Sequence, residues 1–342
     1  MNIFRKKSVL IFIFSALFLL ILVGSFWILL KSQKQSREEI TPPPLEVEEA
    51  EFGIYVFNNK LSEGENFILT DTLIPIIEIK NIKKIDKLKS ISLDKGPNIL
   101  TDRLSATEIK ETQDGLLIKP RYAIAPKEHV IDIVTLVKNQ EVSQRFSFVL
   151  LIKDNFNSAL DKSKLWIIPE STKERVQKSW YIENNRLKID SLPQGPHVSL
   201  AFLYTFDDDI TIDFYLKSLS EVVNLLVYFL ESDKSIIIGN GNNYTTWILH
   251  GSKADKGDDI LIDPGFQYRV RVVRDDFTYK LFVQKTDKRT DDIIGIFSEM
   301  DPVLVFVDER PSLKEDHIGF ALWSGSGGVE IDDVVITGYA IY

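Results

Sequence analysis

The 342-residue sequence has no cysteine and only two methionines and four histidines. Without cysteine, the chain can form no disulfide, thiolate zinc site, iron–sulfur cluster or cysteine nucleophile. The four histidines show no metal-ligand spacing and lie far apart, at His129, His197, His250 and His317. No nucleophile motif such as Gly-x-Ser-x-Gly lies near them. These absences exclude several enzyme classes and leave packing as the source of stability.

The chain after residue 37 has a net negative charge. The whole chain has a formal charge of -9, and residues 1–37 contain six basic residues and no acidic one, so the remainder has a charge of -15. An acidic surface disfavours binding to nucleic acid and to anionic membrane surfaces, which both need clustered Lys and Arg. Neutral sugars, cations and basic proteins remain open as partners.

One long apolar run stands out near the N-terminus. Ser8 to Leu30 contains 23 residues without a charge, which is long enough for a helix to cross a bilayer. A cleaved signal peptide is the alternative, but its apolar region is shorter and ends in small residues, whereas Phe26, Trp27 and Leu30 close this run. The sequence predicts a basic tip and transmembrane helix at residues 1–30.

Residues 31–51 are polar and contain three consecutive prolines, Pro42 to Pro44, followed by several glutamates. This composition is typical of a stiff, solvated stalk. Basic residues flank the apolar run on both sides, so the charge rule gives no clear orientation.

Residues 52–152 carry five segments with the composition and alternation of strands. They are Phe52–Phe57, Leu73–Ile79, Leu116–Lys119, Val130–Val137 and Arg145–Leu151. The stretch from Ile118 to Gln140, followed by Phe146-Ser-Phe-Val, resembles the closing strands of bacterial immunoglobulin-like repeats. It departs from them at Glu128, where a glycine is usual, and at the turn Lys138-Asn139-Gln140. The resemblance implies a non-catalytic β-sandwich that serves as a spacer or interaction module.

Residues 153–342 show a second, longer strand pattern in which almost nothing requires a helix. The segments are Ser179–Ile182, Arg186–Ile189, Ile210–Leu216, Leu225–Leu230, Tyr268–Val273, Thr278–Val283, His317–Leu322 and Val329–Tyr339. Apolar residues alternate with polar ones on both sides of Asp275-Asp276, which predicts an antiparallel hairpin with one buried face. The fold class is therefore an all-β ectodomain behind one transmembrane helix.

Three pieces of residues 153–342 resemble the concanavalin A-like lectin/glucanase (laminin-G-like) jelly roll. They are Asp154-Asn-Phe, the stretch from Trp180 to Ile189, and the stretch from Ile318 to Ile336. The resemblance implies that the first and last strands pair. This superfamily contains lectins, adhesion modules and hydrolases, so the resemblance leaves function open. Surface modules of this kind place the ectodomain outside the cytoplasm, with the N-terminus inside.

The sequence lacks the Glu-x-Asp-x-x-Glu motif that a glucanase on this fold would carry. Glu330 and Asp332 share a strand face and form the nearest acid pair, but the final acid is missing. We therefore expect no enzymatic activity, with an atypical glycoside hydrolase as the alternative.

Aspartate clusters raise the question of calcium, which takes oxygen ligands from loops and strand junctions. Asp154 and Asp333 form the preferred pair, because the resemblance implies that the first and last strands meet there. Exposed aspartates in turns usually serve only the turn, so structural calcium is one of two interpretations.

Sugar binding commonly uses an aromatic ring beside amide or carboxylate groups. Trp247 and Tyr244 lie just beyond an Asn-rich turn that ends at Asn243, and these three are the candidate ligand-binding residues. Core packing is the stronger interpretation of Trp247. The leading hypothesis is a single-pass cell-membrane protein whose lectin-like head binds carbohydrate or acts in adhesion. A non-catalytic scaffold that binds another envelope protein is the alternative.

Overall fold

The computed structural model describes residues 52–82, 87–102, 106–160, 165–190, 198–207, 209–239, 245–250, 253–290, 292–297, 299–309, 315–323 and 325–342. The predicted transmembrane helix and stalk lie outside these residues. Among the residues described, no helix is long and apolar enough to span a bilayer. Phe52–Tyr342 forms one compact unit. Its described residues fold into strands, with one short helix, α2 (Lys173–Ser179), so the all-β prediction is confirmed.

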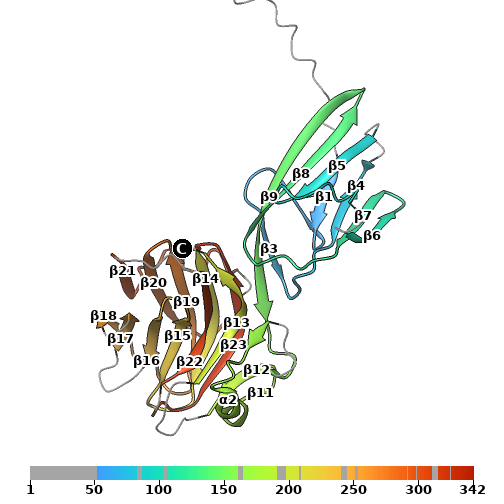
Figure 1. Cartoon of the computed structure of the whole chain (residues 1–342). Helices are drawn as coiled ribbons and strands as arrows, with labels where there is room; N and C mark the ends of the chain where they lie inside the picture. The colour runs from blue at the N-terminus through green and yellow to red at the C-terminus, as the bar shows by residue number, and fades with distance from the viewer. Residues whose placement is uncertain are drawn as a thin grey trace, which may run out of the picture. The chain divides into compact units, whose positions relative to one another are not determined.

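Residues 52–152 form two facing sets of strands (Figure 1). One set is an antiparallel sheet, in the order β2 (Asn59–Lys60), β1 (Gly53–Val56), β4 (Ile77–Lys80), β7 (Gly115–Pro120) and β6 (Ala106–Glu111). The other set contains β5 (Lys87–Leu93), β8 (Glu128–Val137), β9 (Gln140–Asp154) and β3 (Phe67–Thr70), which runs parallel to β9. Isoleucines from both sets fill the space between them, since β-branched side chains pack well on pleated strands.

A two-residue turn joins β8 to β9. Lys138 and Asn139 have φ angles of 51° and 64°, and Val137 pairs with Gln140. Two consecutive left-handed residues form the turn whose twist matches that of the flanking strands. The segment that departs from the immunoglobulin-like pattern therefore still closes a tight hairpin.

Residues 153–342 form a sandwich of two antiparallel layers. One layer is a seven-stranded sheet in the order β10 (Trp166–Ile167), β13 (Val198–Phe206), β22 (Asp316–Leu322), β15 (Asn224–Phe229), β16 (Lys234–Gly239), β17 (Thr245–His250) and β18 (Lys253–Asp259). The other has the order β21 (Leu304–Val307), β20 (Thr278–Thr286), β19 (Gln267–Asp275), β14 (Ile210–Ser218) and β23 (Val329–Thr337). Phe214 and Phe320 meet between the layers, with ring centroids 5.0 Å apart.

Strand β9 connects the two regions. It pairs with β8 and β3 along most of its length, and its end pairs with β23, where Asp154 lies opposite Val334. The predicted pairing of the first and last strands of residues 153–342 is therefore confirmed. The predicted boundary after residue 152 lies inside β9, so one continuous strand carries the chain from one region into the next.

The predicted hairpin is present as β19 and β20, but the prediction that only one face is buried was wrong. Arg269 and Arg271 lie on the face opposite the sandwich core and are both 0% exposed. Arg271 donates from Nε to Asp213 at 2.9 Å and also to the carbonyl oxygen of Ile293. Its guanidinium lies 4.9 Å from the centroid of the Phe297 ring. The segment that follows β20 therefore covers this face.

Candidate functional site

A short hairpin lies beside the sandwich and is joined to it through β23. It consists of β11 (Trp180–Glu183) and β12 (Arg186–Ile189), and Leu187 of β12 pairs with Ile331 of β23. Asn184 and Asn185 form its turn with φ angles of 53° and 56°, which asparagine tolerates better than most residues. Helix α2 leads directly into this hairpin, and Figure 1 shows the two elements together at one end of the sandwich.

The loop after β9 faces the same hairpin and is organised by Asp154. One carboxylate oxygen of Asp154 accepts from the backbone N–H of Phe156 at 2.8 Å, and the other accepts from the indole N–H of Trp166 at 2.6 Å. Burial raises the pKa of Asp154, although both hydrogen bonds oppose the shift. Phe156 has a φ of 49° and is buried in a stacked contact with Trp166. Asp154 thus stabilises a loop backbone that a bulky residue rarely adopts.

A pocket of about 540 Å³ lies between the loop, α2 and the hairpin. We call it the hairpin pocket. Its apolar lining comes from Phe156, Ala159, Leu160, Ile168, Val176, Trp180 and Ile182, and its polar or amphipathic lining from Asn157, Ser158, Gln177, Tyr181, Asn184 and Asn185. Trp180 is 3% exposed and belongs to the core, whereas Tyr181 is 42% exposed.

The residues that the structure describes around the hairpin pocket include no charged side chain, although the protein is acidic. Carboxamides both donate and accept hydrogen bonds, as sugar hydroxyls do. Among the described residues, the side chains of Gln177, Asn184 and Asn185 make no hydrogen bond. The phenol of Tyr181 donates to Asp190 at 3.3 Å, which limits where its ring can lie. The pocket therefore offers an aromatic ring and several neutral polar groups to a ligand.

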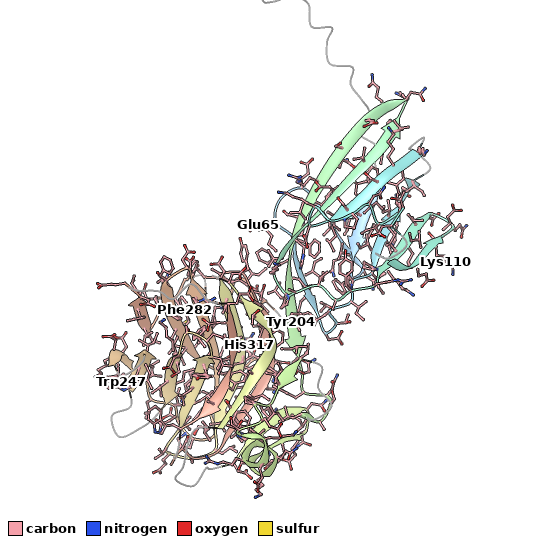
Figure 2. The ribbon with its side chains drawn as sticks, in the orientation of Figure 1. Glu65, Lys110, Tyr204, Trp247, Phe282 and His317 are labelled. Atoms are coloured by element: carbon pink, nitrogen blue, oxygen red, sulfur yellow. The ribbon has the colours of Figure 1, made fainter. Side chains whose placement is uncertain are left out.

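Trp247 lies on a different surface. Its strand β17 pairs with β16, so that Trp247 is opposite Ile237, while the neighbours Ile236 and Ile248 belong to the core. Trp247 is therefore on the outward face of the seven-stranded sheet and is half-buried, so core packing was the wrong interpretation. Figure 2 shows Trp247 and Tyr204 toward opposite edges of this sheet. The other two sugar-binding candidates, Tyr244 and Asn243, lie outside the described residues.

Asp154 and Asp333 are brought near each other by the pairing of β9 with β23, but each is bound to other protein groups. Asp333 forms ion pairs with Lys153 at 3.4 Å and with Arg289 at 3.5 Å. The described part of the chain contains no group of three or more acidic or histidine side chains that could hold a metal ion. The geometry gives Asp154 the role of organising a loop.

Glu330 and Asp332 lie on one face of β23 and both face cations. Arg186 contacts Glu330 at 3.1 Å and Asp332 at 3.2 Å, while Lys188 contacts Glu330 at 3.2 Å. Burial would raise the pKa of Glu330, but hydrogen bonds from Lys188 and Arg186 outweigh it and lower the pKa. Burial raises the pKa of Asp332. The pair that the sequence offered for hydrolysis is thus part of an ion-pair network.

The sequence analysis missed Tyr181, Asn184 and Asn185 as site residues. They lie within a stretch that the sequence assigned to fold alone, and the pocket needs three segments that only the folded chain brings together. The adjacent asparagines were the available signal, because an Asn-Asn pair between two short alternating runs is typical of a tight hairpin turn.

No protein-family model matches the sequence. A search of curated proteins also finds no match. Among solved structures, the chain is similar to the carbohydrate-binding module CBM66 from Bacillus subtilis, at 11% identity and a TM-score of 0.35 over 51% of this chain and 97% of the module. It is also similar to a Bacillus subtilis protein of unknown function with a galectin-like fold, at 13% identity and a TM-score of 0.41 over 56% and 96% of the two chains.

A further similar structure is the exoplasmic/lumenal domain of VIP36 bound to Ca²⁺ and Man3GlcNAc, at 8% identity and a TM-score of 0.37 over 52% of this chain and 85% of that domain. All three identities are below 25% and all three TM-scores are below 0.5. The proposed function therefore rests on the residues of this chain alone.

Proposed function

We propose that residues 153–342 bind neutral carbohydrate in the hairpin pocket, without catalysis. The observation that carries this proposal is the neutral lining of a pocket of about 540 Å³ in an acidic protein. Ligand pockets of about 300–1,000 Å³ commonly combine an apolar wall with a few well-placed polar groups. A sugar ring matches this combination, because its C–H face packs on an aromatic ring while its hydroxyls meet carboxamides.

The rest of the chain fits a protein that presents this pocket at a cell surface. The uncharged run Ser8 to Leu30 supports a single-pass membrane anchor, and the proline-containing segment that follows supports a stalk. In this proposal residues 52–152 are an immunoglobulin-like spacer and residues 153–342 are a concanavalin A-like head. The basis for both family names is the sequence resemblance.

The proposal is tested by applying the full-length chain to a broad glycan array, with and without a calcium chelator. We expect neutral glycans to bind in both conditions, because the described lining of the hairpin pocket contains no carboxylate to hold a metal ion. Binding only to charged glycans, or binding abolished by the chelator, would contradict this site.

The matched variants for the array change an asparagine to glycine at a left-handed turn position. Asn185→Gly removes a carboxamide from the hairpin pocket, and Asn58→Gly makes the same change at a turn with a φ of 65° in the other region. Glycine adopts this backbone without strain, so neither variant should disturb its turn. We expect only Asn185→Gly to weaken binding.

Binding to another protein is a second candidate function, favoured by β21. This strand ends one sheet and exposes Val305 by 54% and Val307 by 58%. Exposed apolar side chains at a sheet edge are typical of strands that pair with a partner. A blank glycan array in both conditions would favour this function over carbohydrate binding.

A further inference from the structure

A second cavity adjoins the hairpin pocket. It measures about 500 Å³ and lies where the loop after β9 meets the segment that follows β3. We call it the junction cavity. Asn157 and Ser158 line both cavities, so the loop after β9 forms a wall common to the two.

We propose that the hairpin pocket and the junction cavity are two halves of one extended site that binds a linear neutral oligosaccharide. This inference rests on the proposed function and specifies the class of ligand. The two cavities together have about 1,000 Å³, which is at the upper end of the range for small-ligand sites. A single sugar unit would leave most of this space empty.

The shared wall is held rigidly. Its backbone is fixed by Asp154, whose two carboxylate oxygens accept from Phe156 and from the indole of Trp166. The rings of Phe156 and Trp166 stack with centroids 6.2 Å apart, and both side chains are buried. Because this loop is already ordered, a chain passing over Asn157 would bind without the entropic cost of fixing its wall.

The junction cavity has the amphipathic character that a pyranose ring needs. Its apolar side includes Ile74, which is 55% exposed, and Leu203, which is 43% exposed, together with part of Tyr204. Asp71 and Asn155 line the same cavity and supply hydrogen-bonding oxygens. Figure 2 shows Tyr204 on β13, on the side of the sandwich that carries this cavity.

The charges in the junction cavity disfavour an anionic ligand. Lys153, the lysine in its lining, forms an ion pair with Asp333 at 3.4 Å. Asp154 is already bound by Trp166 and Phe156. The remaining carboxylate, Asp71, would repel an anionic sugar and can accept hydrogen bonds from hydroxyls. A neutral chain therefore fits both cavities.

The test is the dependence of affinity on chain length. The full-length protein is titrated calorimetrically with two-, four- and six-unit linear oligomers of glucose, of mannose and of N-acetylglucosamine. We expect at least one series to bind, with an affinity about tenfold higher for six units than for two. The variant Leu203→Asp should abolish this gain and leave the affinity for the two-unit oligomer unchanged.

Leu261→Asp is the matched control, because Leu261 is 54% exposed and lines neither cavity. If Leu203→Asp lowers the melting temperature, Ile74→Asp places a charge in the same cavity from a different segment of the chain. Equal affinities for two and six units, or a gain that survives in both variants, would overturn the extended site and leave the proposed function standing. Absence of binding by all three series would overturn both.

Discussion

The two regions of this protein have cores of different composition, and the proposed function gives them different roles. Among the described residues, the core cluster of residues 52–152 has 18 buried side chains, of which Phe148 is the one aromatic. The cluster of residues 153–342 has 36, of which ten are aromatic. Aliphatic side chains fill the first region closely, whereas aromatic residues such as Phe156 and Trp166 in the second also organise the walls of a pocket. In the proposed function, the first region is a spacer and the second region binds the ligand.

The largest expected effect on the free energy of unfolding comes from the buried charges of the second region. Asp213→Ala leaves Arg269 and Arg271 buried without their carboxylate, so we expect the free energy of unfolding to fall by about 3–5 kcal/mol. Chemical denaturation followed by tryptophan fluorescence measures it. The matched change in the first region is Asp132→Ala, whose partner Arg145 is 64% exposed, and it should leave the unfolding midpoint unchanged. Equal losses of unfolding free energy in the two variants would contradict the burial of Arg269 and Arg271.

The next effect separates stability from binding. Phe148→Ala removes the aromatic residue of the first core, and we expect a loss of about 3–4 kcal/mol in the free energy of unfolding. Glycan affinity, measured at a temperature where the variant remains folded, should not change. A weaker affinity would show that the first region contributes to binding and would break the comparison.

The smallest expected effect is on the pH dependence of stability, and it involves one carboxylate in each region. Burial would raise the pKa of Asp94, but hydrogen bonds from His129 and the N–H of Val130 outweigh it and lower the pKa. The contribution of Asp94 to stability is present at neutral pH and is lost as the pH falls through the pKa of the folded protein. Burial raises the pKa of Asp154 in the folded protein. Its contribution to stability is therefore fully present below the pKa of the unfolded chain and is lost as the pH rises through the pKa of the folded protein.

Melting temperatures of Asp94→Asn and Asp154→Asn, measured between pH 7 and pH 3 against the unmodified protein, check these signs. The deficit of Asp94→Asn should shrink as the pH falls, whereas that of Asp154→Asn should grow. The same trend in both variants would contradict the opposite environments described for the two carboxylates.

The elements predicted best from the sequence are the strands in which apolar and polar side chains alternate. The hairpin of β19 and β20 and the strand β12 follow directly from side chains that alternate every second residue. The pairing of β23 with β9 came from a resemblance rather than from alternation, and it is present. These elements account for much of the second region.

The features that sequence missed depend on segments that meet only in the folded chain. Arg269 and Arg271 alternate with apolar residues, a pattern that indicates a solvent-exposed face, yet both are buried. Phe297 and Ile293 contact Arg271, and Arg269 lies over the ring of Tyr215. Helix α2 is only seven residues long and has no long apolar period to reveal it. Asp154 was placed correctly beside β23, but its partners Phe156 and Trp166 lie in its own loop and in β10.

The central claim is that the hairpin pocket, rather than the outward face carrying Trp247, binds neutral carbohydrate. The most direct measurement compares the affinities of Tyr181→Ala and Trp247→Ala for one glycan that the unmodified chain binds. Tyr181 lines the pocket, and Trp247 lies on the outward face of the seven-stranded sheet. We predict about tenfold weaker binding for Tyr181→Ala and unchanged binding for Trp247→Ala. Weaker binding for Trp247→Ala with Tyr181→Ala unchanged would contradict the claim.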